Sequence, residues 1–220
     1  MQNSTTQLHE KYRPKQWSEV VGQEKVIAKI NHLRGRTLAG LAGRAFWLSG
    51  KSGTGKTSIA RLIAADVSDE LNTYEIDAGT CTVEELRRIE GYWALYGMGE
   101  KTGRAFIVNE AHGLKAAAIR QLLVMLERMP GHCVMIFTTT IDGENLFEEN
   151  MDSSPMLSRC VRLDLAQRDL AKAFAERAAQ IAASENLGSA PIATIVKIVN
   201  DCRSNFRAVL QSIEAGALLA

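Results

Sequence analysis

The segment from Gly50 to Thr57 contains the residues whose chemistry follows most directly from their types and spacing. It reads Gly-Lys-Ser-Gly-Thr-Gly-Lys-Thr and matches the pattern G-x-x-x-x-G-K-[ST]. Glycines let backbone N–H groups turn inward around phosphate oxygens, where a side chain would obstruct them. Lys56 could then reach the β- and γ-phosphates of ATP, and the Thr57 hydroxyl could bind Mg²⁺. The segment predicts a nucleotide-binding loop with these contacts: Gly50, Ser52, Gly53, Thr54, Gly55, Lys56, Thr57 and Ser58.

Two polar residues, Asn109 and Glu110, follow the apolar run 105–108. Glu110 lies where a carboxylate could polarise the water that attacks ATP. In an enzyme with such a phosphate-binding loop, position 109 would normally be an aspartate that holds the water shell of Mg²⁺. Asparagine can accept a hydrogen bond from a metal-bound water but adds no negative charge, so we expect weaker Mg²⁺ binding. The alternative is that both residues merely cap the next helix.

Short apolar segments alternate with segments of helical periodicity through the first three quarters of the chain. This alternation predicts an α/β fold, a P-loop NTPase with a parallel five-stranded sheet sandwiched by helices. The nucleotide-binding loop would then join a strand to a helix, as its chemistry requires. We expect strands at 45–49, 73–77, 104–109, 133–138 and 161–165, and helices at 23–33, 57–67, 83–93 and 116–129.

From Ala166 onward no further strand is expected. Helical periodicity recurs over 170–185, 192–200 and 205–219. We therefore expect two domains, a nucleotide-binding domain at 1–165 and a small all-α lid at 166–220. The polar residues 1–10 are expected to be mobile.

Composition bounds the possible functions. The 220 residues include 26 Lys and Arg against 25 Asp and Glu, a net charge of +1, so a nucleic-acid surface would have to be a local patch. The four cysteines are widely spaced, which argues against a zinc site and against a disulfide framework. No apolar run approaches the roughly 20 residues that span a bilayer. The simplest expectation is a cytoplasmic protein without a membrane partner.

Further motifs, in the correct order along nearly the whole chain, resemble those of AAA+ ATPases and, more narrowly, of clamp-loader subunits. Lys11-Tyr12-Arg13-Pro14 with Val21-Gly22-Gln23 resembles the family's N-terminal segment, which lies against the adenine. Phe137 to Thr140 is similar to the end of the sensor-1 strand, and Ser158-Arg159-Cys160 matches the S-R-C motif. Asn205-Phe206-Arg207 resembles the segment that carries the sensor-2 arginine.

The resemblance implies a role for several of these residues. Tyr12, Arg13, Pro14 and Val21 would surround the base. Thr139, which we favour over Thr138, would orient the attacking water. Arg159 would act in trans, entering the site of a neighbouring subunit, and Arg207 would contact the γ-phosphate so that the lid closes on ATP.

The implied function is ATP-driven loading of a sliding clamp on primer–template DNA, within an oligomer of clamp-loader-type subunits. DNA contacts would come from helix N-termini and basic residues, against the alternative that these are solvated charges on exposed faces. The family's helical collar domain has no counterpart in this sequence, and neither has the zinc module of its bacterial branch. The residues expected at DNA are Thr80, Arg87, Arg88, Lys115 and Arg120.

Two other functions stay open from the sequence. The first is a non-hydrolysing scaffold that binds ATP and contributes Arg159, which Asn109 favours. The second is another AAA+ machine, such as a branch-migration motor or a remodeller. The combination of Tyr12-Arg13-Pro14 with Ser158-Arg159-Cys160 argues against this second function.

Overall fold

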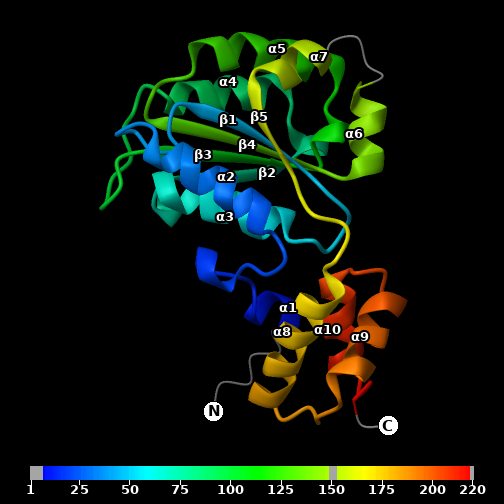
Figure 1. Ribbon diagram of the computed structural model, residues 1–220. Helices are drawn as coiled ribbons and strands as arrows, with labels where there is room; N and C mark the ends of the chain where they lie inside the picture. Colours follow the sequence, from blue (N-terminus) through cyan, green and yellow to red (C-terminus); the bar gives the residue numbers. More distant parts are fainter. Residues whose placement is uncertain (1–6, 149–152, 219–220) are drawn as a thin grey trace.

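A five-stranded parallel sheet forms the centre of the larger part of the molecule (Figure 1). The computed structural model describes residues 7–148 and 153–218. The strand order is β2-β3-β4-β1-β5, and all neighbouring pairs are parallel. The alternating pattern in the sequence therefore predicted the sheet correctly. The strands are β1 (Arg44–Ser49), β2 (Thr73–Asp77), β3 (Arg104–Asn109), β4 (Cys133–Thr139) and β5 (Cys160–Asp164).

Helices cover both faces of this sheet. Alternate side chains of β1 enter different cores, because successive residues of a strand point to opposite faces. Phe46 and Leu48 pack with the helices α2 and α3, whereas Trp47 packs on the other face with α4, α5 and α7. The covering helices are α2 (Glu24–Gly35), α3 (Lys56–Val67), α4 (Val83–Tyr92), α5 (Ala116–Arg128), α6 (Ile141–Glu148) and α7 (Ser153–Ser158).

The helices after the sheet form a core of their own. They are α8 (Ala171–Ser184), α9 (Ile192–Asp201) and α10 (Phe206–Glu214), and Phe174, Val199 and Val209 lie in their common core. We call these three helices the lid helices. The position of the domain boundary at residue 166 stays a prediction.

The short helix α1 (Leu8–Lys11) lies beside α8 and α10 (Figure 1). Leu8 is buried against Ile181 and Leu210. The expectation that residues 1–10 are mobile is therefore wrong for residues 8–10, because this apolar contact anchors them. Residues 1–6 lie outside the described part of the chain.

Element ends differ from the expected ones by a residue or two, with one larger exception. Helix α10 ends at Glu214 rather than at 219, since Gly216 adopts a left-handed conformation with φ +95° that stops the helix. Residues 219 and 220 are outside the described ranges.

Four 3₁₀ turns complete the described elements: η1 (Trp17–Glu19), η2 (Glu70–Asn72), η3 (Ala78–Thr80) and η4 (Ala111–Gly113). None of the helices in residues 7–148 and 153–218 is long and apolar enough to cross a membrane.

Candidate nucleotide-binding site

The carboxyl ends of the parallel strands bring the predicted chemical groups to one edge of the sheet. The loop Gly50–Thr57 follows β1, and the pair Asn109-Glu110 stands at the end of β3. Thr139 ends β4, which lies between these two strands and pairs with both. Open parallel sheets bind ligands at this edge, so the topology places the predicted groups where a nucleotide site is expected.

Two glycines give the loop its shape. Gly53 and Gly55 have φ values of +74° and +97°, the left-handed region that L-side chains avoid. Gly55 directly precedes α3, so the positive end of that helix faces the loop. A Cβ on Gly53 would lie 1.9 Å from Oδ1 of Asn205, which caps α10. The N–H of Phe206 also donates to the Gly53 carbonyl at 3.2 Å, so the lid helices contact the loop directly.

Lys56 is buried at the start of α3. Its Nζ donates hydrogen bonds of 3.0 Å to the carbonyls of Gly50 and Lys51. Burial lowers the pKa of Lys56; the carboxylate of Glu110 acts in the opposite direction, and the nearby Arg207 lowers the pKa further. Lys56 is therefore within electrostatic reach of both Glu110 and Arg207, although the three residues come from distant segments.

A single pocket joins the loop, the N-terminal segment and the lid helices. Tyr12, Arg13, Pro14 and Val21, predicted around the base, line this pocket, and so do Glu110 and Arg207. Of the predicted loop contacts, all except Gly50 line it. The contacts of these residues with a nucleotide stay predictions. Eight further residues line the pocket that were not predicted as site residues: His9, Glu19, Val20, Ile59, Phe174, Arg177, Phe206 and Leu210.

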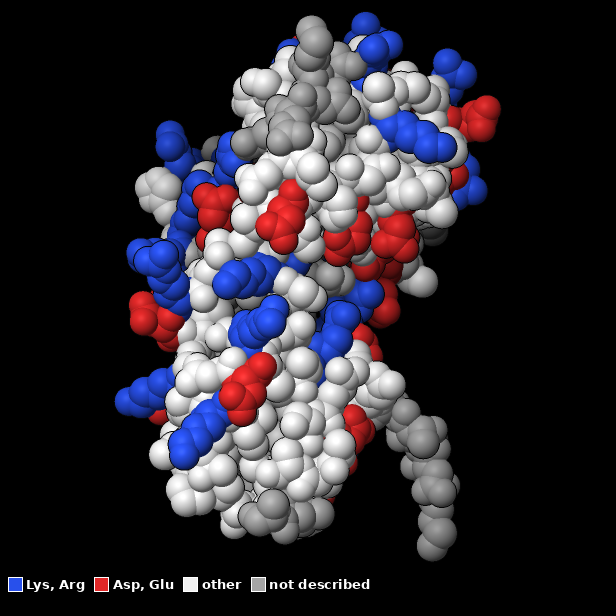
Figure 2. Space-filling model, turned by 90° about the vertical axis from the view of Figure 1, so that its right-hand side faces the viewer, with Lys and Arg blue, Asp and Glu red and all other residues white. Residues whose placement is uncertain are grey.

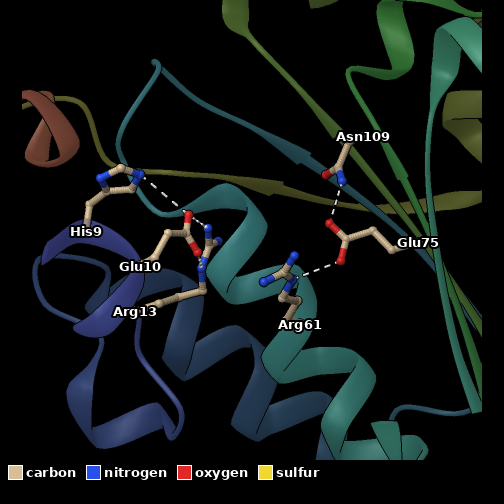
Figure 3. Close-up of polar contacts among 6 residues, drawn as sticks. All are labelled: His9, Glu10, Arg13, Arg61, Glu75 and Asn109. Carbon is tan, nitrogen blue, oxygen red and sulfur yellow. Dashed lines mark hydrogen bonds and ion pairs between the residues drawn. The ribbon is translucent and has the colours of Figure 1, made fainter. Parts of the chain in front are cut away.

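Asn109 is held by hydrogen bonds at both ends of its amide. Oδ1 accepts from the Thr138 hydroxyl at 2.9 Å, and Nδ2 donates to Oε1 of Glu75 at 2.7 Å. Nε of Arg61 lies 2.9 Å from the other oxygen of Glu75. Figure 3 shows Asn109 and Arg61 both directed at the Glu75 carboxylate. Asn109 does not line the pocket, so its expected action on the Mg²⁺ shell stays a prediction.

Thr139 is fully buried and is linked to Glu110 through a histidine. Its hydroxyl donates to the Thr140 carbonyl at 3.1 Å and lies 3.0 Å from Nδ1 of His112. The same nitrogen of His112 is 3.6 Å from the Glu110 carboxylate. Glu110 has a φ of +52°, an uncommon conformation for a residue other than glycine, and such strain is frequent at functional sites.

Gln23, predicted only as part of the motif Val21-Gly22-Gln23, is almost completely buried. Its Oε1 accepts from the N–H of Ala166 at 2.7 Å, and its Nε2 donates to the Thr54 carbonyl at 3.4 Å. One amide side chain thus connects the nucleotide-binding loop to the segment between β5 and α8.

Arg159 lies at the opposite edge of the sheet from this pocket. It precedes β5, and Cys160 pairs with Ala45 near the start of β1, whereas the loop follows the end of β1. The length of β1 separates the two edges by about 15 Å. Arg159 donates to the Pro155 carbonyl at 2.7 Å and forms an ion pair with Glu127. It therefore does not take part in the pocket of its own chain.

The residues expected at DNA are exposed, but they are not all equally available. Arg88 pairs with Glu85 at 2.6 Å, and its guanidinium lies over the Tyr74 ring. The Thr80 hydroxyl donates to the Asp77 carbonyl at 2.9 Å. Lys115 directly precedes α5, and Arg120 lies within that helix. Figure 2 shows one face of the molecule with basic side chains densest along its left margin and acidic side chains among them. Binding of DNA by these residues stays a prediction.

The fold and the site define a P-loop nucleotide-binding protein: a parallel sheet, a glycine-rich loop between β1 and α3, and an acidic residue after β3. Residues 46–162 match the family model described as "ATPase family associated with various cellular activities (AAA)". The chain belongs to this family of ATPases.

Several relatives are subunits of DNA polymerase III. The chain is 32% identical over 158 residues to the gamma/tau subunit of Mycobacterium tuberculosis, which covers 60% of this chain and 27% of that protein. It is 29% identical over 203 residues to the tau subunit of Bacillus subtilis, covering 82% of this chain and 34% of that protein. The chain thus spans about a third or less of the length of these relatives.

The fold is also found among solved structures. The RuvB Holliday junction branch migration motor of Thermotoga maritima superposes with a TM-score of 0.72. The match covers 92% of this chain and 64% of that chain at 22% sequence identity. At this identity the similarity establishes the fold alone.

Proposed function

We propose that this chain binds ATP with Mg²⁺ and hydrolyses it. The observation that carries the proposal is that Lys56, Glu110 and Arg207 line one pocket together with the loop residues 52–57. Backbone N–H groups, a lysine and an arginine can stabilise the charge of the transferred phosphoryl group. Glu110 would polarise the attacking water, with His112 and Thr139 fixing the position of its carboxylate.

The residues around the loop suit Mg²⁺. This ion prefers oxygen ligands and keeps several waters when it is bound through phosphates. Thr57 and Glu110 both line the pocket and offer oxygen atoms. Bound there, Mg²⁺ would neutralise phosphate charge, with Thr57 as a ligand and Glu110 and Asn109 acting through water. Within the described residues, no group of three or more His, Cys, Asp and Glu side chains could hold a metal.

At the level of the assembly, the proposal is a clamp-loader-type subunit that acts in the cytoplasm with like subunits. Two observations support it. The named relatives are subunits of DNA polymerase III, and Arg159 faces away from its own pocket, as a residue that serves a neighbouring subunit must. A sliding clamp and primer–template DNA would be the substrates of the assembly.

A steady-state ATPase assay of the chain, with its partner subunits and DNA, tests the hydrolysis. We expect Lys56→Ala to lose ATP binding, and Glu110→Gln to keep binding but lose turnover by a factor on the order of 10² or more. Glu84→Gln, a change of an exposed carboxylate on α4, is the matched control and should leave turnover unchanged. Equal turnover in Glu110→Gln and the unmodified chain would contradict the assignment of Glu110.

The second candidate function is a scaffold that binds ATP without hydrolysing it. The neutral Asn109, with both ends of its amide engaged, favours this function. ATP binding without turnover in the complete assembly would support the scaffold, whereas turnover that disappears in Glu110→Gln would eliminate it. Motor activity on DNA by a chain that binds no sliding clamp would contradict both candidates.

A further inference from the structure

The carboxylate of Glu185 holds the N-terminal segment on the lid helices. Glu185 directly follows α8, and its Oε1 accepts hydrogen bonds from Nζ of Lys11 at 2.5 Å and from the Tyr12 hydroxyl. Hydrogen bonds to an ionised carboxylate are stronger than those between neutral groups. The two hydrogen bonds also shift the pKa values of the groups that form them. Lys11 and Tyr12 lower the pKa of Glu185, and the bond to Glu185 raises the pKa of Tyr12.

Apolar packing fixes the same segment to the same helices. Leu8 of α1 is buried against Ile181 of α8 and Leu210 of α10. The N–H of Tyr12 donates to the Leu8 carbonyl at 2.9 Å, so the position of Tyr12 follows that of α1. Polar and apolar contacts therefore attach Tyr12 to the lid helices, although it lies more than 150 residues before them in the chain.

Tyr12 lines the nucleotide pocket, whereas Glu185 does not. The pocket has two chemically different parts. The loop and Lys56 offer N–H groups and a charge that suit phosphates, while Tyr12, Pro14 and Val21 offer aromatic and apolar surface that suits a base. Phe174, on α8, adds to the apolar part and belongs to the same helix that Glu185 follows.

We propose that Glu185 is a positioning residue for nucleotide binding: it holds Tyr12 so that the base-facing wall of the pocket belongs to the lid helices and moves with them. The inference rests on the proposed binding of ATP. It implies that closure of the lid helices presses the Tyr12 segment against the base while Arg207 approaches the phosphates. Recognition of the base and of the phosphates would then be coupled in one movement.

The test compares two ligands that share the phosphates but differ in the base. Binding of ATP and of inorganic tripolyphosphate to the full chain is measured by calorimetry. We expect Glu185→Ala to weaken ATP binding about three- to tenfold and to leave tripolyphosphate binding within twofold of the unmodified chain. Glu185→Gln keeps an acceptor oxygen for Tyr12 and should regain part of the loss. Glu176→Ala removes an exposed carboxylate from the same helix and is the control that should change neither affinity.

A second measurement needs no ligand. Hydrogen exchange of the amides of residues 8–12 should become faster in Glu185→Ala and stay unchanged in Glu176→Ala, because Glu185 bonds to this segment and Glu176 pairs with Lys172 instead. Unchanged ATP affinity and exchange in Glu185→Ala, or an equal loss for ATP and tripolyphosphate, would overturn the inference. If the unmodified chain bound no ATP, the proposed function would fail instead, and the exchange rates would still decide whether Glu185 holds α1.

Discussion

Lys56 illustrates how a residue predicted to bind phosphate can lower the stability of the fold. Its ammonium is buried beside Arg207, and burial together with that charge outweighs the attraction of Glu110. The pKa of Lys56 is therefore lowered in the folded chain, which means that its charged form costs folding free energy. The two hydrogen bonds to loop carbonyls offset only part of this cost, since they do not restore the pKa to 10.5.

We therefore expect Lys56→Met to stabilise the chain by about 1 kcal/mol at neutral pH while abolishing ATP binding. In the unmodified chain the unfolded state binds more protons between the lowered pKa and 10.5, so stability rises with pH across that interval. The advantage of Lys56→Met should be largest at neutral pH and shrink as the pH approaches 10.5. Chemical denaturation at several pH values measures it, and an advantage that grows with pH would contradict the account.

Residues that belong to a contiguous motif could be predicted from the sequence. The side chains that hold those residues in place through hydrogen bonds could not. The loop Gly50–Thr57 has a spacing that few other functions require. Glu75 and His112 were missed because each reaches Asn109 or Thr139 from another segment. An acidic residue within a strand and a histidine after one carry no distinguishing pattern in a single sequence.

Among the elements, the contact between the loop and α10 depends on the absence of one side chain. Gly53 combines a φ of +74° with close approach of Asn205, so any Cβ there meets strain and a clash together. We expect Gly53→Ala to push the start of α10 off the loop and to weaken ATP binding at least tenfold. The control is Gly35→Ala, because a Cβ on Gly35 meets nothing within 4 Å. Calorimetry gives both affinities, and equal affinities would show that α10 does not need this contact.

Elements that a local pattern specifies were predictable, whereas elements held by distant contacts were not. The strands β2 and β3 were predicted with their observed ends, since polar residues bound the alternating Tyr74 and Ile76 of β2 and the apolar run 105–108 of β3. The helix α6 was missed, because Asp142-Gly143 reads locally as a turn. Glu144 of this helix accepts hydrogen bonds of 2.8 Å from Trp47 of β1 and Arg162 of β5.

If contacts with β1 and β5 hold α6 in place, Glu144 stabilises the fold through its bonds to Trp47 and Arg162. Glu144→Ala would leave the indole N–H of Trp47 buried without its acceptor, and we expect a loss of roughly 2 kcal/mol in the free energy of unfolding. The denaturant midpoint measures the loss, with Glu100→Ala as the exposed control. A change below about 0.5 kcal/mol would mean that local sequence, rather than the bonds to β1 and β5, forms this helix.

In the whole molecule, the pocket and Arg159 lie at opposite edges of the sheet. This separation bears on whether one chain can hold all the predicted residues of the site. If Arg159 acts in trans, as predicted, a complete site needs two chains, the first with the loop and Glu110 and the second with Arg159. Mixing two inactive variants tests this arrangement. The Arg159→Ala chain keeps an intact pocket, and the Lys56→Ala chain keeps its Arg159.

We expect each variant alone to lose ATPase activity, by a factor on the order of 10³ for Arg159→Ala, since arginines of this kind stabilise the transferred phosphoryl group. A mixture of the two should recover a substantial fraction, because some interfaces combine an intact pocket with an intact Arg159. A mixture of Lys56→Ala with Glu110→Gln is the control and should recover nothing, since every pocket then carries a defect of its own. Full activity of Arg159→Ala alone, or equal recovery in both mixtures, would show that the site is complete within one chain.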